Sequence, residues 1–303
     1  MPCRVPVVLV VFNRLEQTAR VFAAIAAARP ERLFVIADGA RADRDGEAER
    51  VAAVRTVVER IDWPCRVERN YAATNLGARQ RIVSGLDWVF EHVDQAIILE
   101  DDCLPAPAFF DFCADLLERY RDDRRVFSIA GSNFAREDAV PAHYFSRFSL
   151  MWGWATWADR WQAYVADPKD VDAVVARTWP NRPLARAHWR KVMASVNNLD
   201  RSVWDYQWIL TLWRHDALCC RPTVNLVENI GFGADATHTT VATSRVANLP
   251  VYNGESGFAQ PLSAVAADAL RDAVDEREWA LIGWRSLVVM YLPALYRLWA
   301  RHR

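Results

Sequence analysis

The sequence predicts an α/β protein: a doubly wound, mostly parallel sheet with flanking helices, in a single two-lobed domain. The first 130 residues alternate short β-branched runs with segments whose apolar residues recur at helical spacing. The chain has 303 residues, twice the usual ~150 per domain. It contains neither an internal repeat nor a long linker that would divide it.

The first half follows a β-α-β-α order. We expect strands at residues 5–12, 32–37, 65–69, 95–100 and 125–130, and helices at 15–29, 46–61, 77–92 and 107–121. Strands joined by crossover helices pair in parallel, and right-handed crossovers place helices on both faces. In such sheets ligands bind beyond the carboxyl ends of the strands, so we look for a site among the polar residues that follow each strand.

The second half is expected to complete the sheet. It contains a strand-like run at 144–150, a tryptophan-rich segment at 152–164, helical stretches near 184–198 and 203–216, and a strand at 219–227. A glycine-bearing loop follows at 231–240, and two closing helices are expected at 263–300. We therefore divide the chain into residues 1–135, 136–260 and 261–303.

Charge and cysteine content exclude several classes of protein. The formal net charge is −1, so no overall field attracts nucleic acid. The six cysteines form no C-x-x-C pair, which predicts reduced thiols in a cytoplasmic protein. The apolar run at 5–12 lacks the cleavage site of a signal peptide. Arg285, Pro293 and Arg297 interrupt the apolar segment at 279–300, so we expect no membrane-spanning helix there.

Three consecutive carboxylates, Glu100, Asp101 and Asp102, end the apolar run of the strand at 95–100. Side chains alternate along an extended chain, so Glu100 and Asp102 are expected on one side and Asp101 on the other. Carboxylate oxygens suit a hard cation such as Mn²⁺ or Mg²⁺, which binds a diphosphate and stabilises it as a leaving group. The alternative is that these acids cap the helix that begins near Pro107.

Other strand ends carry groups that suit a nucleotide. Phe12 and Arg14 follow the first strand, Asp38 follows the second, and Arg81 lies on the helix after the third. Aromatic rings and guanidinium groups stack on bases, a carboxylate accepts from a ribose hydroxyl, and arginine binds phosphate. Each residue alone also fits a turn or a solvated surface. The sequence lacks a G-x-G-x-x-G after the first strand and a G-x-x-x-x-G-K-[ST], which argues against a dinucleotide dehydrogenase and a P-loop NTPase.

A series of motifs extends over about residues 5–240. They are VVLVVFNR, VIADG, NLGARQRIVSGLDWVF, IILEDDCLPAPAFFDF, the Gly153-Trp154 region, RSVWDYQW and CRPTVNLVENIGFGADATHT. In this order they resemble nucleotide-diphospho-sugar-dependent glycosyltransferases of the GT-A fold, in particular a bacterial relative of the N-acetylglucosaminyltransferase I group. The resemblance implies that residues 1–135 bind the nucleotide sugar and that residues 136–260 bind the acceptor and supply the catalytic base.

The resemblance also assigns roles to the donor-site residues. It implies that Asp102 ligates Mn²⁺ and that Glu100 and Asp101 contact the donor sugar and the ribose. Arg14 and Asp38 are implied to hold the uridine of a UDP-sugar. Arg81 falls where the family has a uridine-contacting histidine.

Inverting displacement of a nucleoside diphosphate needs a carboxylate that accepts the proton of the acceptor hydroxyl. The resemblance implies that this base is Asp205, with Trp204 beside it in the acceptor or sugar pocket. A helix N-terminus would keep Asp205 ionised, as a base requires. The alternative is a capping box that begins at Ser202, in which Asp205 at the third helical position only binds a backbone N–H.

Two further residues complete the predicted site. Trp154 is expected in the sugar pocket because an aromatic face packs on C–H groups and the indole N–H binds a hydroxyl; the spacing of the neighbouring tryptophans is typical of a core. His238 is expected to approach the diphosphate or complete the metal site when its loop closes, whereas a lone loop histidine is commonly an exposed residue. The basic, aromatic residues of 279–303 suit a membrane surface or a closing helix equally well.

We therefore expect a metal-dependent inverting glycosyltransferase that moves a sugar from a UDP-sugar to a saccharide or lipid-linked acceptor in bacterial surface polysaccharide synthesis. Its expected cofactor is Mn²⁺ or Mg²⁺, and its expected location is the cytoplasm, with a peripheral contact at the inner membrane surface as an open alternative. A sugar-nucleotide nucleotidyltransferase is the second candidate, although it needs a Gly- and Lys-rich loop that VVFNRLEQ does not provide. A non-catalytic carbohydrate-binding protein is the third.

Overall fold

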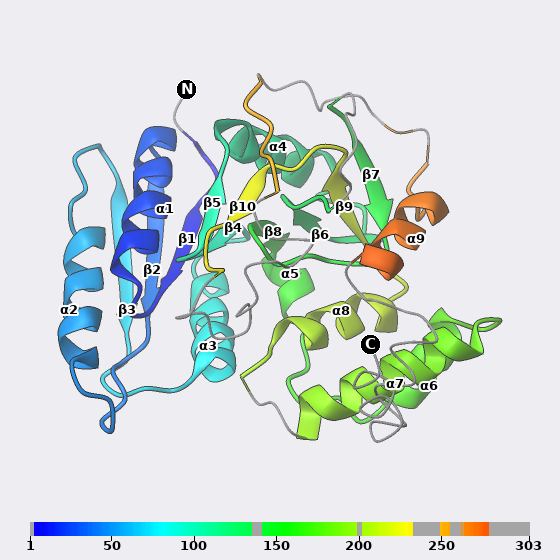
Figure 1. Cartoon of the computed structure of the whole chain (residues 1–303). Helices are drawn as coiled ribbons and strands as arrows, with labels where there is room; N and C mark the ends of the chain where they lie inside the picture. The colour runs from blue at the N-terminus through cyan, green and yellow to red at the C-terminus, as the bar shows by residue number, and fades with distance from the viewer. Residues whose placement is uncertain are drawn as a thin grey trace, which may run out of the picture.

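The computed structural model of the chain describes residues 3–134, 141–198, 202–232, 249–254, 262 and 264–278. The strands of its main sheet are β1 (Val7–Val11), β2 (Arg32–Ala37), β3 (Arg66–Tyr71), β4 (Gln95–Glu100), β6 (Val126–Ala130), β7 (His143–Ser146), β8 (Trp154–Trp157) and β9 (Leu218–Pro222). These eight strands lie in the order β3-β2-β1-β4-β8-β6-β9-β7 (Figure 1). Only β8 and β7 run antiparallel to their neighbours in this described sheet, so the predicted α/β class with a mostly parallel sheet is confirmed.

Helices cover both faces of this sheet. The described helices are α1 (Leu15–Ala28), α2 (Glu47–Val58), α3 (Ala78–Phe90), α4 (Pro107–Arg119), α5 (Ala158–Trp161), α6 (Val171–Thr178), α7 (Pro183–Asn198), α8 (Asp205–Arg214) and α9 (Ala269–Glu278). Residues of α1, α2 and α4 form an apolar cluster with one face, and residues of α3, α5 and α8 form a second cluster with the other face. Helices α6 and α7 pack on α8 in a third apolar cluster. The sheet is therefore doubly wound, as predicted.

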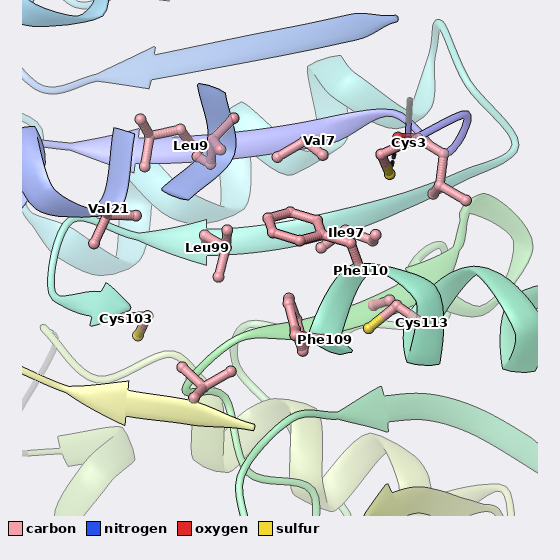
Figure 2. Packing of buried hydrophobic residues seen from close by; sticks show 14 of the residues in the cluster. Cys3, Val7, Leu9, Val21, Ile97, Leu99, Cys103, Phe109, Phe110 and Cys113 are labelled. Atoms are coloured by element: carbon pink, nitrogen blue, oxygen red, sulfur yellow. Dashed lines mark hydrogen bonds between the residues drawn. The ribbon is translucent and has the colours of Figure 1, made fainter. Parts of the chain in front are cut away.

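The central strands are apolar on both sides because both sides are covered. In β1, Val7 and Leu9 belong to the first cluster, whereas Val8 and Val10 belong to the second. Figure 2 shows the first cluster from close by, with side chains of α4 packed against those of β1 and β4. Alternate residues of one strand thus face opposite layers, and the polar residues are left for the strand ends.

Two parts of the second half differ from the prediction. The tryptophan-rich segment supplies β8, which pairs with β4 on one side and with β6 on the other. The strand expected at 219–227 ends at Pro222, because proline has no N–H to continue the ladder. Residues Val227–Asn229 instead form β10, which pairs with β5 (Cys103–Pro105) in a separate ribbon. The second half completes the sheet as predicted, through β7, β9 and the unexpected strand β8. The division of the chain at residues 135 and 260 stays a prediction.

An internal ion pair fastens α9 to the edge of the sheet near β7 (Figure 1). Arg221 of β9 pairs with Asp275 of α9, and their side chains are 0% and 3% exposed. The Arg221 Nη2 also donates to the Ser132 carbonyl over 3.1 Å. A second bond follows at Ser146, whose Oγ donates to Asp272 Oδ1 over 2.7 Å. Because both charges are removed from water, their pairing matters more than that of an exposed salt bridge.

Acid is expected to destabilise the fold through His188 of α7. This imidazole is 3% exposed, and its Nδ1 has no hydrogen-bond partner within the described ranges. Burial lowers the pKa of His188 to about 4, below the ~6.5 of an unfolded chain. The unfolded chain therefore binds more protons below pH ~6.5, and the free energy of unfolding falls by on the order of 2 kcal/mol as the pH drops toward 4.

Urea denaturation of the wild type and of His188→Leu at pH 7 and pH 4.5 measures this effect. The wild type should lose on the order of 2 kcal/mol more than the variant between the two pH values. If the wild type and His188→Leu lost the same free energy of unfolding between the two pH values, burial would not oppose the protonation of His188.

No helix among the described residues is long and apolar enough to cross a lipid bilayer. Residues 279–303, which carry the predicted membrane contact, lie outside the described residues, as do residues 233–240 of the predicted mobile loop. All six cysteines are free thiols, and all but Cys65 are buried.

Candidate functional site

The carboxyl ends of β1, β2 and β4 meet at one edge of the sheet. Val10 of β1 pairs with Glu100 of β4, and Val11 pairs with Ala37 of β2. The residues that follow these strands are therefore neighbours in space. They include the predicted donor-site residues Phe12, Arg14, Asp38, Glu100, Asp101 and Asp102.

We name Glu100, Asp101 and Asp102 the acid turn, because β4 ends at Glu100 and the next two residues turn before β5. The predicted alternation over the three residues is therefore wrong. Arg14 Nη1 donates to Asp102 Oδ2 over 2.6 Å and lies 3.5 Å from Asp101 Oδ1, so both aspartates face the same cation. The helix α4 begins without a side-chain cap bond, so the acid turn does not cap it.

Burial and mutual repulsion act on the carboxyl groups of the acid turn. Burial, together with the charges of Asp102, Asp101 and Asp205, raises the pKa of Glu100 well above its usual value. Burial and Asp102 raise the pKa of Asp101 to about 7, against the opposing charge of Arg14. Burial alone would lower the pKa of Arg14, but Asp101 and Asp102 outweigh it, so that pKa is raised. Several carboxylates thus share Arg14, an arrangement that favours a further cation.

The segment after β10 packs directly on Asp102. The Ile230 N–H donates to the Asp102 carbonyl over 2.8 Å, and the Gly231 N–H donates to Asn229 Oδ1 over 2.8 Å. A Cβ at position 231 would overlap Asp102 Oδ2 and would come within 2.8 Å of the Asp102 Cβ. Glycine is therefore needed here for the close approach of backbone to carboxylate.

Gly231→Ala is expected to displace the Asp102 carboxylate and to weaken Mn²⁺ binding in the presence of UDP by about 10–100-fold, the usual effect of disturbing groups that orient a metal ligand. Titration calorimetry on the variant and the wild type measures it. Gly254→Ala is a control because position 254 approaches the Tyr252 ring and not the acid turn. Unchanged Mn²⁺ affinity in Gly231→Ala would mean that Asp102 does not bind the cation.

Asp38 organises the loop that precedes α3. It is 4% exposed, and its carboxylate accepts four hydrogen bonds of 2.9–3.0 Å. The donors are the N–H groups of Gly39, Leu76 and Gly77 and the Asn75 side-chain amide. Asp38 therefore has a structural task at the site edge, and its predicted contact with uridine stays a prediction.

Arg81 of α3 is buried and is not a solvated surface residue. Arg81 is 5% exposed, and its Nη2 donates to Asn70 Oδ1 over 2.9 Å. The Arg81 Nε has no hydrogen-bond partner in the described part of the chain. Burial lowers the pKa of Arg81, while the charge of Asp38 opposes this change. A uridine contact of Arg81 also stays a prediction.

The sequence motifs did not indicate a hydrogen-bonded network around Glu47, close to Phe12. Glu47, which is 1% exposed, accepts from Asn13 Nδ2 over 3.0 Å and from the Arg41 N–H over 2.8 Å. The Arg41 guanidinium also binds this carboxylate and lowers the pKa of Glu47 to about 2. The same guanidinium lies 5.5 Å from the centroid of the Phe12 ring. An acid in the first turn of α2 is the signal that could have suggested this anchor.

Asp205 is the first residue of α8. Its Oδ1 accepts the Tyr206 N–H over 3.0 Å, and its charge contributes to the raised pKa of Glu100. The helix has Trp204 as its N-cap, so Asp205 is its first residue and not the third position of a capping box that begins at Ser202. The bond to the Tyr206 N–H is still the backbone contact that the capping alternative expects. The helix dipole at this end stabilises an ionised carboxylate. The role of Asp205 as a base stays a prediction.

Tryptophans 154 and 204 are both part of an aromatic cluster. Trp154 is 0% exposed, and its ring centroid lies 5.6 Å from those of Trp204 and Trp208. The prediction that Trp154 meets the sugar is therefore wrong, because β8 is a central strand with both faces covered. Trp204 is 5% exposed.

Trp152, one residue before the turn at Gly153, is the better-placed aromatic residue. It is half-buried, and its ring centroid lies 5.1 Å from Phe134 and 5.8 Å from Phe232. Phe232 directly follows Gly231, which packs on Asp102. This aromatic group is therefore joined to the acid turn through the chain, at Gly231 and Phe232.

Within the described residues, no group of three or more His, Cys, Asp or Glu side chains is arranged to hold a metal ion. His238, the second predicted ligand, lies outside those residues. The acid turn fits a cation that is shared with a diphosphate, since such a cation needs only one or two protein carboxylates. Asp102, whose side chain is 15% exposed, is the carboxylate that would hold it.

Comparison with known proteins finds distant similarity of fold. No family model matches the sequence, and no curated protein matches it. A mannosyltransferase from Pyrobaculum calidifontis in complex with GDP-Man and Mn²⁺ matches over 65% of this chain and 53% of its own, at 14% identity and a TM-score of 0.38. An apo UDP-glucose pyrophosphorylase matches over 74% of this chain and 93% of its own, at 7% identity and a TM-score of 0.35. The chain thus spans about half the length of the mannosyltransferase, and these matches assign it to no specific family.

Proposed function

We propose that this chain is a metal-dependent inverting glycosyltransferase that moves a sugar from a UDP-sugar to a saccharide or lipid-linked acceptor. The observation that carries the proposal is the acid turn at the carboxyl end of β4, where Asp101 and Asp102 face Arg14 in a site that is largely shielded from water. Asp205 lies separately, at the start of α8. Inverting transfer needs a carboxylate for the acceptor proton and, separately, a charged site for the departing diphosphate. The acid turn and Asp205 supply these two groups.

Each residue has a defined task in this proposal. Asp102 would hold a divalent cation, which stabilises the negative charge of a diphosphate leaving group when bound. Asp205 accepts the proton of the acceptor hydroxyl. The donor is bound by Phe12, Arg14, Asp38, Arg81, Glu100 and Asp101.

On the acceptor side, Trp152 is proposed to contact the sugar, the role that the sequence analysis expected for Trp154. Trp152 is half-buried and forms an aromatic group with Phe134 and Phe232. Trp204 precedes Asp205 in the chain and packs against Trp154. The proposed acceptor is a growing bacterial surface saccharide, free or lipid-linked, on the cytoplasmic side of the membrane.

Titration calorimetry of UDP with and without Mn²⁺ tests the proposal. Mn²⁺ is expected to tighten UDP binding at least about tenfold, and Asp102→Asn should remove this enhancement because it removes a charged ligand. Asp111→Asn is the matched control, since Asp111 is an exposed carboxylate on α4. UDP binding that ignores Mn²⁺ would contradict the metal-dependent transferase.

The released product separates the other candidate functions. A glycosyltransferase releases UDP from a panel of UDP-sugars, whereas a nucleotidyltransferase releases pyrophosphate from UTP and a sugar phosphate. Binding of saccharides without binding of UDP would support a carbohydrate-binding protein instead.

A further inference from the structure

Arg79 binds the chain just before Asp205. It lies in the first turn of α3, and its Nε donates to the Val203 carbonyl over 2.6 Å. Its Nη2 donates to the Val196 carbonyl over 3.0 Å. Val196 lies in the last turn of α7, where a cation also complements the helix dipole. One guanidinium therefore fastens both the end of α7 and the residues that lead into α8.

A second side chain binds the next carbonyl along the chain. The Tyr164 hydroxyl donates to the Trp204 carbonyl over 3.2 Å. The Tyr164 ring stacks on that of Trp161, with centroids 4.8 Å apart, and the Trp161 Nε1 donates to Asp87 Oδ1 of α3 over 2.8 Å. Burial raises the pKa of Tyr164, so its hydroxyl stays protonated and can donate. The carbonyls of both residues before Asp205 are therefore bound by groups that lead back to α3.

We propose that Arg79 and Tyr164 are positioning residues, which hold Asp205 in the place where it accepts the proton of the acceptor hydroxyl. This role rests on the proposed function, in which Asp205 is the general base. A base works only within hydrogen-bond reach of the proton that it accepts, and a small displacement lowers the rate steeply. Neither positioning residue touches the reacting groups, because each acts on the main chain that carries Asp205.

The start of α3 is itself tied to the end of β2. Asp38, which follows β2, accepts the Leu76 and Gly77 N–H groups over 2.9 Å and 3.0 Å. Gly77 is the N-cap of α3, two residues before Arg79. Because the Arg79 side chain starts from this anchored turn, its bonds can fix the start of α8 relative to the sheet. Such bonds between distant segments keep a catalytic group in the geometry that its reaction needs.

The turnover number, measured by UDP release, tests the inference together with UDP affinity in the presence of Mn²⁺. Arg79→Met removes the guanidinium but keeps an unbranched stem, and we expect it to lower the turnover number roughly 10–100-fold, the effect of a small misplacement of a reacting group. Tyr164→Phe removes only the hydroxyl and should lower it roughly 2–10-fold, the equivalent of one hydrogen bond. UDP affinity should not change, because both residues are proposed to act through the base.

A double variant gives a readout that a structural role alone would not produce. In Asp205→Asn the base is absent, so the addition of Arg79→Met should lower the remaining turnover by less than about twofold. Arg79→Lys keeps a donor and should recover part of the turnover that Arg79→Met loses. Arg20→Met is the charge-matched control, because Arg20 is an exposed residue of α1, and it should leave the turnover number unchanged.

Failure of this inference is distinguishable from failure of the proposed function. If Arg79→Met costs the same factor in the wild type and in Asp205→Asn, Arg79 does not act through the base. A loss of UDP affinity in Arg79→Met would place Arg79 in the donor site instead. In both cases the proposed function stands. If Arg79→Met does not fold, Tyr164→Phe in the same two backgrounds decides the question by the same comparison. If Asp205→Asn keeps most of the turnover, the proposed base is wrong and the positioning role fails with it.

Discussion

Asp205→Asn is expected to lower the turnover number by about 10²–10⁴-fold, the contribution of a positioned general base. Asparagine has nearly the same shape, and its carbonyl can still accept the Tyr206 N–H that Asp205 accepts over 3.0 Å. It has no basic oxygen to take the acceptor proton. The affinity for UDP should be unchanged, because Asp205 is proposed to act on the acceptor side.

Release of UDP under saturating donor and acceptor measures the effect, and UDP affinity is measured on the same samples. The control is Asp216→Asn, just beyond the other end of α8, where the side chain is 74% exposed and pairs with Arg177. If Asp205→Asn keeps most of the turnover, another group removes the proton. A parallel loss of UDP affinity would place Asp205 in the donor site instead.

Breaking the buried pair between Arg221 and Asp275 is expected to cost about 3–5 kcal/mol of the free energy of unfolding. Arg221→Met leaves the Asp275 carboxylate without its partner in a site that is 3% exposed, and Asp275→Asn leaves the arginine charge. The double variant Arg221→Met/Asp275→Leu removes both charges and should recover much of the loss, because a buried pair can be replaced by apolar packing.

Urea denaturation of the two single variants and the double variant gives these values. Arg190→Gln breaks a pair whose side chains are 46% and 80% exposed, and it should change stability by less than about 1 kcal/mol. Single variants that cost no more than this control would show that α9 is not held to β9 by the pair.

The first half of the fold was predictable because its signals are local. The apolar run before Glu100 ends where β4 ends, and Pro107 begins α4 as proline commonly begins a helix. Apolar residues at successive positions of β1 predict a strand that is covered on both faces. These features depend on neighbours in the sequence, and the structure confirms them.

The errors concern contacts between distant segments. Trp154 was expected in the sugar pocket, but the insertion of β8 between β4 and β6 buries it, and no local pattern reveals that position. The bond between Arg14 and Asp102 joins residues that are 88 positions apart. The strand ends indicated which side chains gather at the site, whereas the partner that each side chain chooses depends on the assembled sheet.

The position of β8 also determines which truncated forms of the chain can fold. A fragment that ends at residue 135 keeps β4 and β6 but loses the strand that lies between them and bonds to both. Each would then carry an open edge over an apolar surface, which is a template for aggregation. A fragment of residues 1–135 is therefore expected to aggregate, because the strand that joins β4 to β6 comes from the second half of the chain.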